Sequence, residues 1–164
     1  MTQVDRVTKL INQLLNVARR PPYQPRPLDL KKVLSNVLNL IEERARETHV
    51  EAEIDWDEER TFHTRGDPDH LEQVFLNLCV NAIQAMPQGG TLRIGLQDSE
   101  DQIHITVGDT GEGISQENLS KIFDAFFSTK PKGEGSGLGL VMSQSIVQEH
   151  GGTISVESTL GHGT

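Results

Sequence analysis

Residues 67–86, DPDHLEQVFLNLCVNAIQAM, decide the fold that we predict, because they specify one long helix around which the remaining segments can pack. Asp67 suits the N-cap position, and Pro68 suits the first helical turn, where a missing N–H costs nothing. A stripe of apolar residues recurs at helical spacing: Leu71, Val74, Phe75, Leu78, Ala82 and Ala85. Further apolar residues lie around the rest of the circumference, so we expect this helix to be covered on most sides.

Two asparagines, Asn77 and Asn81, lie one helical turn apart beside this stripe. Their carboxamides, each with donors and acceptors to satisfy, therefore point toward nearly the same place. Taken alone, such a pair is more often an internally hydrogen-bonded pair of core residues than a ligand site. The motifs later in the chain favour the ligand site.

The composition limits the class of protein. The chain of 164 residues is 35% hydrophobic, which fits one compact domain with one extra element. Its net charge of −9 argues against a nucleic-acid partner, because that affinity depends on Lys and Arg. The single cysteine, Cys79, excludes an intrachain disulfide and favours a reducing compartment. No apolar run is long enough to cross a bilayer, so we expect a cytoplasmic domain that makes no membrane contact.

Two segments before residue 28 are predicted to be separate from the globular domain. Four prolines within residues 21–27, PPYQPRP, predict an extended linker. Residues 1–20 are predicted to form a helix with a coiled-coil or bundle seam within residues 3–19, made of Val4, Val7, Ile11, Leu14 and Ala18. Such a seam needs a partner, so we expect a homodimer through residues 3–19 or packing on another helix.

The domain that follows, residues 28–164, is predicted to be α+β, because its helices and strands are mixed without regular βαβ alternation. Helices are expected at residues 28–48, with Asp29 as the cap, at 67–86, at 116–122 and at 138–150. Strands are expected at residues 50–56, which should be half-buried, and at 61–64, 91–97, 103–107 and 153–157.

A first glycine turn, VGDTGEGI at residues 107–114, places Asp109 at the end of a strand. Asp109 can accept a hydrogen bond from an exocyclic amine such as that of adenine. Gly111 and Gly113 let the backbone approach a flat ligand closely. The alternative is a tight turn with a capping aspartate.

A second glycine turn, GEGSGLGL at residues 133–140, directly precedes the last helix. Glycines at alternate positions before a helix make a good anion cradle, because backbone N–H groups and the helix dipole suit phosphates. The chain contains neither GxGxxG nor GxxxxGK[ST], so this is neither a Rossmann fingerprint nor a P-loop.

The segment between the two turns, residues 123–135, is predicted to be a lid, and we call it the lid segment. It has little periodicity and carries Phe123, Phe126 and Phe127, which could otherwise be core anchors. Lys130 and Lys132 could supply local positive charge to phosphates, although exposed lysines are usually only solvated.

Four stretches in order, NLCVNAIQAM, DTGEGI, KIFDAFFSTK and GSGLGL, resemble the N, G1, F and G2 boxes of sensor histidine kinases. These kinases belong to the GHKL superfamily, with gyrase, MutL and the heat-shock chaperone ATPases. The resemblance covers residues 67–152, and the preceding helix and linker resemble the second dimerisation helix and connector of nitrogen-regulation-type kinases. It implies a two-layer α/β sandwich, a mixed sheet backed by helices, preceded by one dimerisation-type helix.

The resemblance also implies ATP and Mg²⁺ as cofactors and gives each site residue a role. Asn81 would ligate Mg²⁺, Asn77 would contact the phosphate side, and Asp109 would bind the adenine amine. Asn77 and Lys130 are the predicted catalytic residues. The other residues expected at the nucleotide are Gly111, Gly113, Phe123, Phe127, Gly135, Gly137, Leu138 and Gly139.

The chain departs from the family pattern in two ways. None of its six histidines is followed directly by Asp or Glu, as the phosphoacceptor would be. We therefore expect the acceptor on a separate helix of the same kinase, and a response regulator receiver domain as the next partner. The sequence also stops at GHGT, where relatives continue, so the final strand is expected to be either absent or supplied otherwise.

Three functions remain open at this point. The first is the ATP-binding catalytic part of a histidine kinase, of which a serine-protein kinase of the anti-sigma type is a variant. The second is an ATP-driven conformational switch, which is disfavoured because Asn77 stands where a carboxylate would activate water. The third is a non-catalytic nucleotide-binding module.

Overall fold

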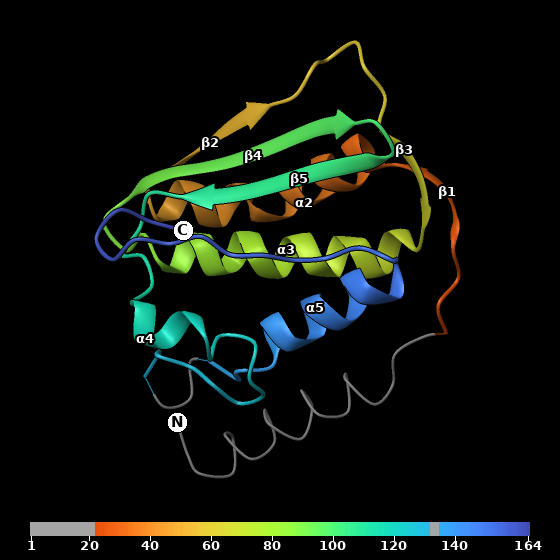
Figure 1. Ribbon diagram of the computed structural model, residues 1–164. Helices are drawn as coiled ribbons and strands as arrows, with labels where there is room; N and C mark the ends of the chain where they lie inside the picture. The colour runs from red at the N-terminus through yellow and green to blue at the C-terminus, as the bar shows by residue number, and fades with distance from the viewer. Residues whose placement is uncertain (1–21, 132–134) are drawn as a thin grey trace.

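The structure is a computed structural model that describes residues 22–131 and 135–164, so the predictions for residues 1–20, Lys132 and Gly133 lie outside the described residues. Figure 1 shows a sheet lying across a layer of helices, which confirms the predicted α+β sandwich. The elements are β1 (Arg26–Asp29), α2 (Leu30–Glu47), β2 (Val50–Asp55), β3 (His63–Gly66), α3 (Pro68–Gln84), β4 (Gly90–Ser99), β5 (Gln102–Asp109), α4 (Gln116–Leu119) and α5 (Gly139–Glu149). No helix in this part of the chain is both long enough and apolar enough to span a bilayer.

The main sheet has the order β2-β4-β5 and is mixed, as predicted. β2 pairs with β4 in parallel, and β4 pairs with β5 in antiparallel register. The alternating apolar side chains of the central strand, Leu92, Ile94 and Leu96, are buried against the helices. β1 and β3 form a separate antiparallel pair at the start of the two main helices.

α3 is the centre of the helix layer, because it contacts α2, α5, β4 and β5. Its cap is as predicted: the Asp67 carboxylate accepts hydrogen bonds from the backbone N–H groups of Asp69 and His70, and Pro68 occupies the first turn. The predicted core stripe is slightly misplaced. Cys79 and Ile83 are fully buried, whereas Leu78 and Ala85 are only half-buried. α3 has neighbours on several sides, namely α2, α5 and the strands β4 and β5. The burial of each side chain on α3 therefore depends on where these neighbours lie as well as on the apolar stripe.

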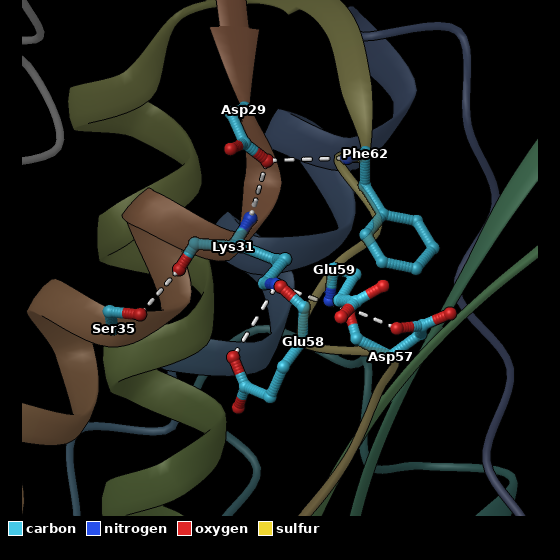
Figure 2. Close-up of polar contacts among 7 residues, drawn as sticks. All are labelled: Asp29, Lys31, Ser35, Asp57, Glu58, Glu59 and Phe62. Carbon is cyan, nitrogen blue, oxygen red and sulfur yellow. Dashed lines mark hydrogen bonds and ion pairs between the residues drawn. The ribbon is translucent and has the colours of Figure 1, made fainter.

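The start of α2 is fixed by the predicted cap, Asp29, as Figure 2 shows. Its carboxylate accepts hydrogen bonds from the N–H groups of Lys31, at 3.2 Å, and Phe62, at 3.3 Å. The ammonium of Lys31 donates to the backbone carbonyls of Asp57, at 3.1 Å, and Glu58, at 2.6 Å. The loop between β2 and β3 is therefore tied to the first turn of α2.

Two strand predictions need correction. The half-buried strand expected at residues 50–56 is β2, but only Val50 on it is buried and Ile54 is 47% exposed. β2 is an edge strand of the sheet, so alternating apolar residues in its sequence do not ensure that their side chains are buried. The strand expected at residues 61–64 begins two residues later, at His63. The helix expected at residues 116–122 is shortened to Gln116–Leu119.

The strand expected at residues 153–157 does not form. In Figure 1 this segment passes across α3, and it joins no sheet, although its side chains still alternate between exposed and half-buried. β5 remains at the edge of the sheet, and residues of β5 and of the segment 153–156 line the same cavity. The only bridge beyond α5 among the described residues joins Thr159 to Gly163.

Candidate functional site

The predicted site residues gather around one large cavity of about 1970 Å³. A single small-molecule site typically occupies about 300–1,000 Å³, so one small ligand would fill only part of this cavity. Its lining residues include residues of α3, α5, the lid segment and the end of β5, a part of the cavity that we call the first compartment, and residues along β5 and within 153–156. Ten of the twelve predicted residues line the cavity: Asn77, Asn81, Asp109, Gly113, Phe123, Phe127, Lys130, Gly135, Gly137 and Gly139. Gly111 and Leu138 do not.

Asn77 links the two helices that form the floor of the first compartment. Its Nδ2 donates a hydrogen bond to Oγ of Ser143 on α5 at 3.0 Å, and Ser143 is buried. A Cβ added to Gly139 would lie 2.2 Å from Oδ1 of Asn77, so a larger residue here would push aside the amide that bonds Ser143. Asn77 therefore fixes where α5 begins, besides facing the cavity.

Asn81 lies one turn further along α3 and is in contact with the lid segment. Its Oδ1 accepts a hydrogen bond from Nζ of Lys130 at 3.0 Å. Gln84, in the last turn of α3, accepts a second hydrogen bond from the same ammonium through Oε1. Burial lowers the pKa of Lys130, and the nearby positive charge of Arg44 lowers it further.

Asp109 ends β5 and also lines the cavity. Its Oδ1 accepts a hydrogen bond from the N–H of Gly111 at 2.8 Å, which forms the turn. Burial raises the pKa of the Asp109 carboxyl, and hydrogen bonds from the backbone of Gly111 and Thr164 oppose the rise. A partly desolvated carboxylate of this kind is well suited to accept a hydrogen bond from a ligand amine.

The glycines of the first turn are required by packing within the protein. A Cβ on Gly111 would lie 2.4 Å from the carbonyl oxygen of Ala85, at the end of α3. A Cβ on Gly113, which has a φ of +66°, would lie 2.2 Å from the carbonyl oxygen of Thr159. These contacts hold the turn after β5 against α3 and residues 159–163, so close approach to a ligand is not the only reason for glycine here.

The second glycine turn leads into a helix start that no side chain caps. Gly137 has a φ of +66°, and its carbonyl accepts a hydrogen bond from the N–H of Phe126 at 2.9 Å. The N–H of Leu138 is used within the turn, where it donates to Oγ of Ser136 at 3.3 Å. The N–H groups of the first turn of α5 lack a side-chain cap beside the cavity, and this arrangement suits an anion.

The described part of the lid segment covers one side of the compartment. Phe123 and Phe127 are half-buried and line the cavity. Phe126 is 63% exposed and has a φ of +69°, which is unusual for an aromatic residue. Its N–H bond to Gly137 and the Lys130 contacts join the lid segment to α5 and α3.

Three residues of the site were not predicted from the sequence. Gln84 follows Asn81 by three positions on the same helix, so its spacing could have shown that it shares that face. Ser143 follows Gly139 by one turn of α5, but nothing local indicates its bond to Asn77. Arg44 comes from α2, and no sequence pattern connects it with Lys130.

This set of groups fits a polyanionic ligand with an amine-bearing ring. The phosphate side would have the uncapped start of α5, Lys130 and Arg44, and the ring side would have Asp109. No three His, Cys, Asp or Glu side chains gather as a metal site in residues 22–131 and 135–164. A divalent cation here would therefore depend on the amide oxygen of Asn81 and on oxygens of the ligand, both suitable for Mg²⁺.

Comparison with known proteins identifies the family of this chain. Residues 66–164 match the family model described as histidine kinase-, DNA gyrase B- and HSP90-like ATPase. The sensor histidine kinase ZraS of Salmonella typhimurium is 34% identical over 162 residues, which cover 98% of this chain and 34% of that protein. The chain thus spans about a third of the length of the curated relatives that it matches first.

Solved structures show the same fold. The nucleotide-free catalytic domain of histidine kinase ThkA superimposes with a TM-score of 0.76 at 29% identity, covering 85% of this chain and 91% of that one. Full-length ShkA in complex with AMPPNP gives a TM-score of 0.80 at 26% identity, covering 97% of this chain and 34% of that one.

Proposed function

Because the chain belongs to the histidine kinase-, DNA gyrase B- and HSP90-like ATPase family, and within it to the catalytic ATP-binding domains of sensor histidine kinases, we propose that it binds ATP with Mg²⁺ and transfers the γ-phosphoryl group to a histidine on a separate segment. The phosphoryl group would then pass to the receiver domain of a response regulator. The finer assignment to the nitrogen-regulation type stays a prediction.

The observation that carries this proposal is the arrangement of α3 and α5 around the cavity. Asn77, Asn81 and Lys130 lie on one side of it with the uncapped start of α5, and Asp109 lies at the end of β5. Groups suited to phosphates and a group suited to an amine thus face the same compartment. The AMPPNP bound in the related ShkA supports an adenine nucleotide as the ligand.

Each residue would act by binding or orienting the nucleotide. Asp109 would accept a hydrogen bond from the adenine amine, with Gly111 and Gly113 shaping the turn beside it. The backbone of Gly135, Gly137 and Gly139 would cradle the phosphates. Phe123 and Phe127 would exclude water, and Leu138 would support the start of α5.

Asn81 would hold Mg²⁺ through Oδ1, and Mg²⁺ would neutralise charge that develops on the phosphates during transfer. Asn77 would keep the first turn of α5 at the phosphate side through Ser143. Lys130 would place its ammonium near the transferred group. Positioning of this kind accounts for most of the catalysis in phosphoryl transfer.

The contexts of the six histidines support a phosphoacceptor on another segment. His70 is buried in α3, and His150 ends α5 with Nδ1 and Nε2 both hydrogen-bonded. The other four lie outside the described helices: His49, His63, His104 and His162. None of them is presented on an exposed helix face, where a family phosphoacceptor would be expected.

The domain organisation that we propose follows from the sequence. Residues 1–20 would be the second helix of a dimerisation hairpin and would self-associate through residues 3–19, and residues 21–27 would be the linker. Residues 28–164 would be the catalytic domain, at the cytoplasmic side of any membrane that the parent protein contacts. Tyr23 and Gln24 contact the beginning of α3, which supports a defined entry of the linker.

An ATP-hydrolysing switch is the main alternative. It would need a carboxylate to activate water at the place of Asn77, and an amide cannot take a proton at neutral pH. The amide of Asn77 is also engaged with Ser143. A non-catalytic module would not need a lysine of the lid segment, Lys130, in contact with Asn81. Both alternatives therefore explain the site less well.

The test is incubation of the whole chain with Mg²⁺ and γ-labelled ATP, with and without the histidine-bearing dimerisation segment of the same kinase. We expect acid-labile, base-stable label on that segment, none on this chain, and very slow release of phosphate. An Asn81→Ala variant should bind nucleotide without metal dependence. Rapid phosphate release without the added segment would instead indicate a hydrolytic switch, and label on this chain would implicate one of its own histidines.

A further inference from the structure

We infer that Gln84 is a positioning residue: it holds the ammonium of Lys130 on the same oxygen of Asn81 that Mg²⁺ would need, so that the lysine and the metal compete for Asn81. This inference rests on the proposed function, because it takes Asn81 as the metal ligand. It goes further by assigning a role to Gln84 and an order to events at the site.

The geometry places one cation on two neutral oxygens. Nζ of Lys130 donates to Oδ1 of Asn81 at 3.0 Å and to Oε1 of Gln84. Asn81 and Gln84 are neighbours at the end of α3, whereas Lys130 lies 49 and 46 residues further along the chain. None of the salt bridges among the described residues includes Lys130. Its ammonium is thus held without being neutralised.

A lysine ammonium and a divalent cation cannot both stay at this oxygen. Mg²⁺ binds oxygen at about 2.0–2.1 Å, so Lys130 at its observed distance would lie no more than about 5 Å from it. Repulsion between the two cations is strong in a partly buried site. Lys130 must therefore leave Asn81 when the metal is held there, and the freed ammonium is then available to the phosphates in the same cavity.

The side chain at position 84 decides how firmly Lys130 occupies Asn81. Gln84 is exposed, so burial does not explain a glutamine here. A carboxamide accepts one hydrogen bond from the ammonium and leaves its charge intact. A carboxylate would pair with Lys130 and also attract the metal, and an apolar side chain would hold neither. Glutamine therefore gives a contact that a metal-bound nucleotide can displace.

The contact also connects the lid segment to α3 before nucleotide arrives. Besides Lys130, the lid segment is joined to the rest of the site by the bond from the N–H of Phe126 to the carbonyl of Gly137. Loss of the Gln84 contact should consequently loosen the residues between these two points while leaving α3 intact. A surface glutamine without this role would have no such effect.

The experiment measures the Mg²⁺ concentration that half-saturates the complex of the whole chain with AMPPNP, by calorimetric titration. It compares wild type, Gln84→Met, Lys130→Met and the double variant. Methionine is close in shape to both side chains and is a good helix former. Lys121→Met is the matched control, because Lys121 is a lysine near the lid segment whose ammonium pairs with Glu117 on α4.

We expect Gln84→Met and Lys130→Met each to lower the half-saturating Mg²⁺ concentration about tenfold, the effect of losing one exposed hydrogen bond to a charged group. The double variant should show no further change, and Lys121→Met should match wild type. Without nucleotide, hydrogen exchange of residues 126–130 should be faster in Gln84→Met than in wild type. AMPPNP affinity without metal is recorded separately, because Lys130→Met also removes a phosphate contact.

The outcomes separate this inference from the proposed function. Wild type that does not bind AMPPNP with Mg²⁺ would overturn the proposed function itself. Nucleotide binding with an unchanged or raised Mg²⁺ requirement in Gln84→Met would overturn only the competition. Independent, additive effects in the double variant would do the same, since they would mean that Gln84 does not act through Lys130. If Gln84→Met lowered the unfolding midpoint, Gln84→Ala would replace it, with the same expected shift.

Discussion

The side-chain amide of Asn77 on α3 donates a hydrogen bond to the buried hydroxyl of Ser143 on α5, at 3.0 Å. This bond crosses between the two helices beside Gly139, where α5 begins. A change at the buried Ser143, which faces α3, should therefore alter the phosphate side of the site through the position of α5.

Ser143→Ala should lower the free energy of unfolding by about 1–2 kcal/mol, because the amide of Asn77 loses its partner in a partly buried place. Nucleotide affinity should fall as well, since the first turn of α5 is held less firmly. Chemical denaturation and calorimetric titration measure the two effects. Ser145→Ala, at an exposed position of the same helix, is the control and should stay within about 0.5 kcal/mol of wild type. Equal effects of both substitutions would mean that the Asn77 contact is unimportant.

Asp109→Asn should weaken ATP binding by about 1.5–3 kcal/mol, through loss of a hydrogen bond to a charged group, and should affect GTP much less. The measurement is calorimetric titration with both nucleotides. Burial penalises the ionised carboxylate, so the substitution should not destabilise the fold at neutral pH. Equal affinity of wild type for ATP and GTP would contradict the assignment of Asp109 to adenine.

The raised pKa of Asp109 predicts opposite pH effects on stability and on binding. Its contribution to folding stability is fully present below the unfolded pKa and is lost as pH rises through the folded pKa. ATP binding needs the ionised form, so affinity should fall as pH is lowered, starting above the usual range for aspartate. Titrations across this pH range in wild type and Asp109→Asn test this, because the variant should lack the dependence.

Asp67 should show the reverse pH dependence of stability. Burial alone would raise its pKa, but the N–H groups of Gln24, His70 and Asp69 together hold the pKa below its usual value. Its contribution is therefore present above the unfolded pKa and is lost as pH falls through the folded pKa. Asp67→Ala should cost about 1–2 kcal/mol at neutral pH. Asp69→Ala, in the same turn but exposed, should cost less; urea unfolding at several pH values compares them.

Tyr23 should stabilise the entry of the linker through two imidazole rings. Its ring is stacked with His70 at 6.3 Å between centroids and meets the edge of His150 at 5.0 Å. Tyr23→Ala should reduce stability by about 0.5–1.5 kcal/mol and speed hydrogen exchange of the Gln24 N–H, which donates to Asp67. Tyr23→Phe keeps the ring and should behave like wild type. A large effect of the phenylalanine variant would assign the role to the hydroxyl.

The sequence predicted best those features that depend on neighbours along the chain. Asp67 and Pro68 specify the start of α3 locally, and Asp29 does the same for α2. The two glycine turns located much of the candidate site in the sequence, because close packing and positive φ values favour glycine at their positions. The same local reasoning identified the faces of Asn77 and Asn81, but it could not show their partners.

Features that depend on distant segments were missed or misplaced. The alternation at residues 153–157 has the period of a strand, but period alone does not supply a neighbouring strand to pair with. Gln84 and Lys130 are in contact although 46 residues separate them in the sequence. Cys79 is buried in the core in place of Leu78, because α3 has neighbours on several sides. In each case the decision depends on tertiary packing.

The outer edge of β5 bears on the solubility of the protein. In the part of the chain that the structure describes, no strand pairs with this edge. The N–H of Asp109 at its end donates to the carbonyl of Thr164, and the rest of the edge borders the cavity without a neighbouring strand. Such an edge is a template for sheet extension between copies, and β5 carries no lysine that would oppose it. Preparations should therefore oligomerise reversibly as concentration rises, and a lysine introduced at the exposed position Thr106 should suppress this.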